Sequence, residues 1–199
     1  MEEVLLGLGT AVVGVVGTLS AIWLKHYLER KKAEKDKCIV HQTVKEDVEI
    51  ISRVEDMIQE VNADRISIFQ FHNGGEYYSG KGMQKMTCTY EAVKPGVSRT
   101  QMGMQNVPVS ACYATLEKLI ENKEFHCMDV EANYPESACK YGLLENGVKS
   151  TYQYAIFNLD KKAIGMLRAD FVLEVEELNE SADNALRYFA IKLSGYLVK

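Results

Sequence analysis

Proline is scarce in this sequence, with only three residues in 199, and no stretch is dominated by a few residue types. Proline-rich linkers and long disordered segments are therefore not expected, because such segments need a biased and polar composition. The chain also lacks a P-loop, a dinucleotide-binding glycine pattern, a serine-centred nucleophile elbow and a spaced pair of carboxylates. Without these signatures, we expect a protein that is not an enzyme.

An excess of positive charge is missing as well. The chain carries 23 Lys+Arg against 28 Asp+Glu, a formal net charge of −5. Affinity for nucleic acid comes mainly from basic side chains that neutralise phosphates. DNA and RNA are therefore not expected as partners.

The cysteines form no framework that the sequence reveals. Their number is odd and no CxxC spacing occurs among them: Cys38, Cys88, Cys112, Cys127 and Cys139. This usage favours reduced thiols in a cytoplasmic domain, although one or two bridges stay open as an alternative. His126 and Cys127 are adjacent and would point to opposite sides of a strand, so we expect no metal site and no cofactor. Cys127 and His72 have no catalytic motif beside them.

The longest apolar run covers residues 4–24, contains no charge, and places Trp23 at one end. As a helix it would span roughly 30 Å, the thickness of the hydrocarbon core of a bilayer. A signal peptide would begin with basic residues, whereas this chain begins with Glu2 and Glu3. The run therefore predicts a transmembrane anchor over residues 1–24, and the membrane is an expected partner.

One face of this helix would carry a stripe of small residues at spacings of three and four. Its members are Gly7, Thr10, Ala11, Gly14, Gly17, Thr18 and Ala21. Small side chains allow the close backbone approach through which membrane helices associate. The stripe favours a homo-oligomer, although glycine is also common in membrane helices in general.

Residues 25–61 predict a stalk helix, because they contain neither glycine nor proline. The basic residues at its start favour a single-pass protein with its large domain in the cytoplasm. Further along, an apolar stripe predicts packing on the domain's own sheet or against a second copy as a short coiled coil. The stripe consists of Val40, Val44, Val48, Ile51, Val54, Ile58 and Val61.

Residues 62–199 predict one α+β domain with a mainly antiparallel sheet and helices on one face. Strands are expected at 65–71, 86–93, 124–130, 150–157 and 163–173, and helices at 110–122, 135–144 and 181–198. Residues 72–75 read as a turn, residues 76–85 as a loop, and Ser110 as an N-cap. The first and last helices, the stalk and 181–198, would lie side by side behind the sheet.

This order resembles the GAF domain, a small GAF/PAS-like binding module of signalling proteins. The run RISIFQFHNGG is similar to its opening strand, and GVKSTYQYAIFNLDKKAIGMLRADF is similar to its closing hairpin, in which a glycine stands in a strand. The resemblance implies a site for a partner or small ligand. His72 and Asn73 at the end of the first strand could line it with Tyr77, Tyr78, Tyr90 and Arg168, although a simple hydrogen-bonded turn is the alternative.

A second resemblance is to the T-type holins of bacteriophages, which combine one membrane helix with a soluble α/β domain. The similar part is the aromatic strand followed by Phe157, Asn158, Leu159 and Asp160, then Ile164 and Gly165, and a terminal helix. It implies membrane lesions for host lysis and a periplasmic domain, whereas the basic cluster predicts a cytoplasmic one. The first hypothesis is therefore a membrane-anchored, non-catalytic GAF-like module, and the alternative is a holin-like protein.

Overall fold

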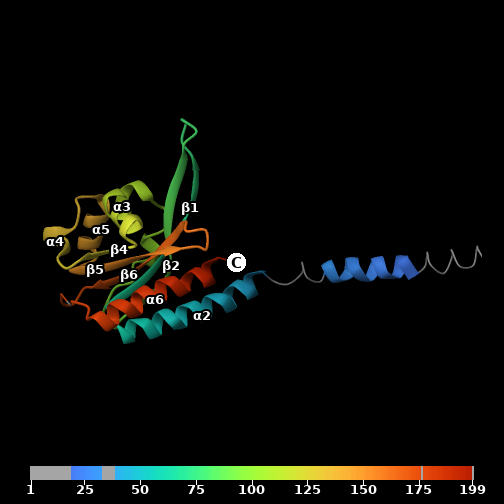
Figure 1. Cartoon of the computed structure of the whole chain (residues 1–199), viewed down its shortest axis with the longest axis horizontal. Coiled ribbons are helices and arrows are strands. Elements are labelled where there is room, and N and C mark those ends of the chain that lie inside the picture. The colour runs from blue at the N-terminus through green and yellow to red at the C-terminus, as the bar shows by residue number, and fades with distance from the viewer. Residues whose placement is uncertain (1–18, 33–38, 176, 199) are drawn as a thin grey trace, which may run out of the picture. The chain divides into compact units, whose positions relative to one another are not determined.

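The computed structural model describes residues 19–32, 39–175 and 177–198 of the chain (Figure 1). It divides into two compact units, residues 1–47 and 48–199, with the boundary inside helix α2, Ile39–Glu60. Most of the predicted anchor and its small stripe, Gly7, Thr10, Ala11, Gly14, Gly17 and Thr18, lie outside the described residues. Residues 19–32 form a helix that includes Ala21. Within the described ranges, no helix combines the length and apolar character that crossing a membrane requires.

The second unit is built on a sheet of six strands in the order β3-β2-β1-β6-β5-β4, all paired antiparallel. The strands are β1 (Arg65–Glu76), β2 (Gly82–Val93), β3 (Val107–Pro108), β4 (Glu124–Cys127), β5 (Ser150–Phe157) and β6 (Ala163–Phe171). The expected antiparallel sheet and its closing hairpin β5–β6 are confirmed. Alternating apolar residues and the turn at residues 158–162 were sufficient to predict both.

Helices cover both faces of the sheet, so the expectation of helices on one face was wrong (Figure 1). One face carries α2 and α6 (Glu180–Leu197), which lie side by side as expected, and Arg53 of α2 stacks 5.5 Å from the Tyr196 ring of α6. The other face carries α3 (Tyr113–Asn122), α4 (Val130–Asn133) and α5 (Ala138–Glu145). The reason is that both sets of alternating strand residues are buried, rather than one.

The main core lies between the sheet and the helix pair α2–α6. Ile66 and Ile68 of β1 pack there with Val54 of α2 and Leu186 of α6, each of which is buried. Phe69, the next residue along β1, belongs to a separate cluster on the opposite face with Met166 and Leu119. Strand side chains alternate between faces, so one strand supplies both cores.

Gly165 marks a close approach between β6 and β1. A Cβ atom at this position would lie 2.2 Å from the carbonyl oxygen of Phe69. No other residue fits there without moving the backbone, which explains the glycine inside an otherwise continuous strand.

Asp64 ties the start of β1 to the end of β6. Its Oδ2 accepts the amides of Val172 at 2.7 Å and Leu173 at 2.8 Å, and its Oδ1 lies 3.3 Å from Nζ of Lys94. Burial by itself raises the pKa of this carboxyl, but the two amides and Lys94 outweigh burial and lower it overall.

Several local expectations were wrong. Residues 72–75 continue β1 instead of turning, and the expected loop 76–85 is largely the tip and start of β2. Ser110 lies in a 3₁₀ turn, Val109–Cys112, so Cys112 rather than Ser110 precedes α3. The strand at 124–130 ends at Cys127, because Asp129 caps α4 by accepting the amide of Ala132 at 2.9 Å.

The burial pattern predicts unequal effects for two leucines. Leu186 is 0 % exposed, and Leu159 in the β5–β6 turn is 99 % exposed. Leu186→Ala should lower the free energy of unfolding by about 2–5 kcal/mol in urea titrations, because it leaves a cavity in the main core. Leu159→Ala is the control and should change it by less than about 0.5 kcal/mol. Equal effects would contradict the assignment of the core.

Candidate binding site

A row of polar side chains crosses the sheet on the face covered by α3, α4 and α5. Strand register places Glu91, Ser67, Arg168 and Gln153 side by side on β2, β1, β6 and β5. The neighbouring row contains Arg65, Asp170 and Thr151, and all seven residues are buried. The two rows together are called the polar row below. A polar row inside a domain is costly unless its groups satisfy one another.

Asp170 connects the two buried arginines of this row. Its Oδ2 lies 3.4 Å from Nη1 of Arg65 and accepts from Nε of Arg168 at 3.0 Å. Its Oδ1 accepts from the Thr151 hydroxyl at 2.8 Å. Arg168 also stacks on Phe69, with Cζ 4.8 Å from the ring centroid.

Glu91 supplies a second negative charge beside Arg65. Its Oε1 lies 3.7 Å from Nε of Arg65 and accepts from the Thr100 hydroxyl at 2.7 Å. The amide of Thr100 donates to both carboxylate oxygens at 3.0 Å, and Nη2 of Arg65 donates to the Ser98 carbonyl at 2.8 Å. Two cations thus face two carboxylates, and the row carries no surplus charge that would attract an ion.

A small cavity lies between this row and the covering helices. It is lined by Arg168, Gln153, Thr115, Tyr134 and several apolar side chains, and its volume is about 10 Å³. Gln153 donates to the Tyr134 hydroxyl at 3.2 Å, which donates to Thr115 at 3.3 Å, and burial raises the pKa of Tyr134. The space is about that of one water molecule, so these side chains already fill the interior.

A disulfide between Cys112 and Cys139 lines the cavity, so the expectation of reduced thiols was wrong for these two cysteines and the alternative of one bridge is the one the structure has. It joins the 3₁₀ turn before α3 to α5, and the two Cα atoms are 5.2 Å apart, a normal spacing for such a bond. Cys88 and Cys127 are free and buried. Burial raises the pKa of Cys88 to about 12, and it also raises the pKa of Cys127, so both stay protonated and are poor nucleophiles. The part of the chain that the structure describes holds no group of three His, Cys, Asp or Glu side chains placed to bind a metal.

The six site residues expected from the sequence do not meet. His72 and Asn73 lie on the outer half of β1, and Tyr77 and Tyr78 lie beyond its end. Tyr90 packs against the core on the α2–α6 face, opposite to the face of Arg168. Of the six, only Arg168 borders the interior cavity.

Sequence reasoning missed the polar row itself. Polar residues recur two apart at Arg65 and Ser67, at Thr151 and Gln153, and at Arg168 and Asp170. Three strands with the same pattern could have indicated a second buried face. The expectation of helices on one face left no second buried face for these residues.

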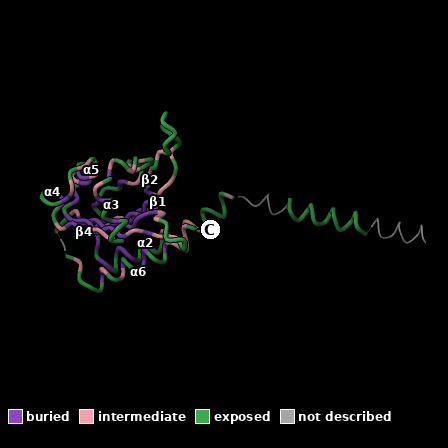
Figure 2. Tube along the Cα trace, turned by 45° about the horizontal axis from the view of Figure 1, so that its top comes forward, coloured by how far each residue is buried: buried purple, intermediate pink, exposed green. Residues whose placement is uncertain are grey.

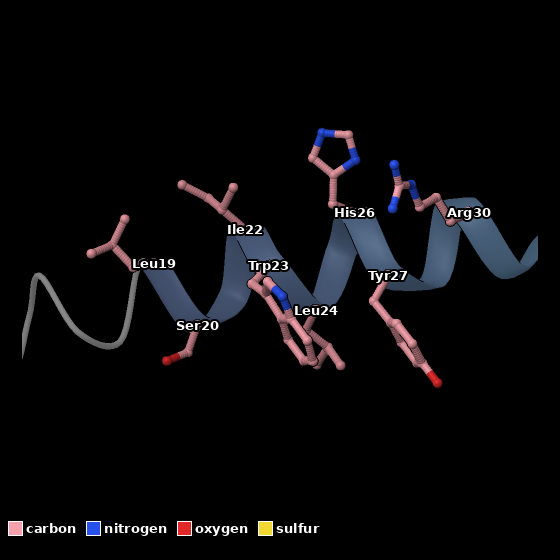
Figure 3. A pocket seen from close by; sticks show the side chains of 8 residues that line it. All are labelled: Leu19, Ser20, Ile22, Trp23, Leu24, His26, Tyr27 and Arg30. Carbon is pink, nitrogen blue, oxygen red and sulfur yellow. The ribbon is translucent and has the colours of Figure 1, made fainter.

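The helix of residues 19–32 carries exposed apolar side chains of its own (Figure 3). Ile22 and Trp23 are 60 % and 68 % exposed, and Trp23 stacks on Tyr27 at 5.6 Å. Ile22, His26 and Arg30 project from one side of the helix in Figure 3, and Trp23 and Tyr27 project from the other. The hollow beside them is lined by this helix alone, so it is an open surface and not a cavity.

Comparison with known proteins identifies the fold. No model of a known protein family matches the chain, and no curated protein matches its sequence. Among solved structures, it is similar to the GAF domain of PixJ from Thermosynechococcus elongatus in its blue-light absorbing form. The TM-score is 0.61 at 14 % identity, over 81 % of this chain and 88 % of that one.

Two further structures agree. One is the GAF domain region of a putative membrane protein from Geobacter sulfurreducens, with a TM-score of 0.59 at 14 % identity over 80 % of this chain and 97 % of that one. The other is the phycocyanobilin-bound GAF domain of a cyanobacterial phytochrome, with a TM-score of 0.59 at 17 % identity over 85 % and 91 %. The chain therefore has a GAF-like α+β fold. Identities this low establish the fold and not the ligand.

The buried row makes a prediction about stability. Asp170→Asn should lower the free energy of unfolding by about 3–5 kcal/mol, because it leaves two buried arginines facing only one carboxylate. Asp160→Asn, in the exposed β5–β6 turn, is the matched control and should change it by less than about 0.5 kcal/mol. Thermal unfolding followed by circular dichroism measures both, and a small effect at Asp170 would mean that water reaches the row.

Proposed function

We propose that this chain is a non-catalytic GAF-like binding module, held at a membrane by its N-terminal apolar run, that self-associates and engages a protein partner. The single observation that carries the proposal is the exposed apolar stripe of α2. Val40, Val44 and Val48 are 70 %, 53 % and 60 % exposed and follow one another at intervals of four. Further along the same helix Val54 is fully buried, so the stripe continues beyond the part that packs on the sheet.

A second copy of the chain is the occupant that best fits this stripe. Residues four apart lie on one helix face, and such a seam matches an identical seam in a coiled coil. The small stripe at Gly7–Ala21 in the sequence would associate in the same way within the bilayer. Together they support an oligomer formed by the N-terminal helices.

The filled interior favours a protein partner over a small ligand. Pockets for small molecules usually measure about 300–1,000 Å³, whereas the cavity beneath α3–α5 measures about 10 Å³. One structural neighbour is described as phycocyanobilin-bound. To bind such a molecule in the interior of this chain, helices α3–α5 would have to move. A bound small ligand is therefore the less favoured version of the proposal.

The disulfide favours a second candidate function. Disulfides persist in oxidising compartments and are rare in the cytosol, so the bridge Cys112–Cys139 supports a domain outside the cytoplasm. That orientation is the one that the resemblance to T-type holins implies. In this alternative, the same helices assemble into a membrane lesion that leads to host lysis.

One test of the proposed function concerns self-association. Val44→Glu should shift the chain in detergent from oligomer to monomer, because it introduces like charges at the seam, and sedimentation velocity measures the change. Lys45→Glu is the matched control, since Lys45 is exposed next to the stripe but not part of it. Unchanged sedimentation of the Val44→Glu chain would show that the valine stripe of α2 does not hold the oligomer together.

Another test concerns the side of the membrane on which the domain lies, and it separates the two functions. Leu159→Cys, in a chain that also carries Cys38→Ser, places an accessible thiol on a 99 % exposed position while the other cysteines are buried or bridged. In intact bacterial cells, an impermeant maleimide should label it only after lysis if the domain is cytoplasmic. Labelling before lysis would overturn the cytoplasmic version and support the holin-like alternative.

A further inference from the structure

The strands β1 and β2 extend beyond the sheet as a two-stranded arm, defined here as residues 71–85. Strand β6 pairs with β1 only as far as Gln70, whereas β1 and β2 remain paired out to Glu76 and Gly82. Strand β3 reaches only Lys85 and Met86 at the base of the arm. Figures 1 and 2 show the arm projecting from the domain, with its outer part exposed.

Side chains along the arm hold its two strands together. Nε2 of His72 lies 2.8 Å from the Thr87 hydroxyl, and Nε2 of Gln84 donates to Oδ1 of Asn73 at 2.8 Å. The Lys85 side chain lies across Gly74, where a Cβ atom would approach its Cε to 2.5 Å. An isolated two-stranded ribbon is only marginally stable in water, so these contacts indicate an arm with a defined shape.

The apex of the arm is a defined turn that presents two tyrosines. The amide of Gly80 donates to the Tyr77 carbonyl at 2.8 Å, and the amide of Tyr77 donates to the Lys81 carbonyl at 2.9 Å. Gly80 has a φ of +75°, which suits glycine at the end of such a turn. Tyr78 at the apex is 110 % exposed and Tyr77 is 44 % exposed.

The arm is also basic on an acidic chain. Lys81 and Lys85 stand against the single acid Glu76, while the whole chain has a net charge of −5. Tyrosine combines an apolar ring with a polar tip and is enriched at the membrane–water boundary. Lysine side chains near an anionic leaflet are attracted to its phosphates.

We propose that the apex of this arm docks on an anionic bilayer surface, with Tyr77 and Tyr78 among the headgroups and Lys81 against lipid phosphates. The proposal rests on the proposed function only in that the N-terminal run keeps the chain near a bilayer. The arm then acts as a second, reversible contact with the same membrane. A protein that binds the apex instead would leave it insensitive to lipid charge.

The test places a fluorescent reporter at the apex. The full chain carrying Tyr78→Trp and Trp23→Phe is reconstituted into nanodiscs of phosphatidylcholine alone or with phosphatidylglycerol. In the anionic discs, we expect its emission to shift to the blue and to be quenched by brominated lipid. Adding Lys81→Glu should remove most of both effects.

Tyr113→Trp in the same Trp23→Phe chain is the matched control, because Tyr113 is 63 % exposed on α3, away from the arm. If the reporter at position 78 behaves as this control does in anionic discs, the proposal is overturned. The unmodified chain reports separately on the anchor through Trp23. If brominated lipid leaves Trp23 unquenched, the proposed anchoring fails. The Tyr78→Trp chain is then measured with added anionic vesicles that contain brominated lipid. Quenching of the tryptophan supports the arm proposal, and its absence overturns it.

Discussion

The contact on which the rest of the domain depends is the buried carboxylate of Asp170 between Arg65 and Arg168. It joins β1 to β6 at the centre of the sheet and fixes their register. If either strand slipped by one residue, its charged side chains in this network would turn toward the apolar face of the sheet. No group there could compensate their charge. Through Arg65 the same network reaches Glu91 and the backbone of Thr100, so it also fixes the loop that follows β2.

The interior of the domain is filled, so its open features lie on the surface. Small-molecule sites usually enclose a cavity of about 300–1,000 Å³. Here the polar row is satisfied mainly by its own members, and the Cys112–Cys139 bridge joins the elements above it. The exposed apolar side chains of the described residues include the valine stripe of α2 and the tyrosines of the arm. Both are open surfaces that enclose no cavity.

Much of the fold could be predicted, because it depends on local periodicity. The β5–β6 hairpin and α6 follow from alternation and from apolar residues three and four apart, and Leu186, Phe189 and Leu193 are buried as that pattern implies. The pairing of Cys112 with Cys139 and the alignment of Arg65 with Asp170 join residues far apart in the chain. Periodicity carries no information on such contacts. Gly74 and Gly75 misled the prediction, because they resemble a turn and instead lie within a strand that accommodates the Lys85 side chain.

The contact at Gly165 has a consequence for how this sequence can vary. Even alanine would place its Cβ against the Phe69 carbonyl, so the position has no conservative replacement. Neighbouring core residues can exchange one aliphatic side chain for another while total volume is kept. Among variants that still fold, this glycine should therefore be retained where its apolar neighbours are replaced by other aliphatic residues. Its spacing from the strand that begins at Arg65 then provides a marker for distant relatives.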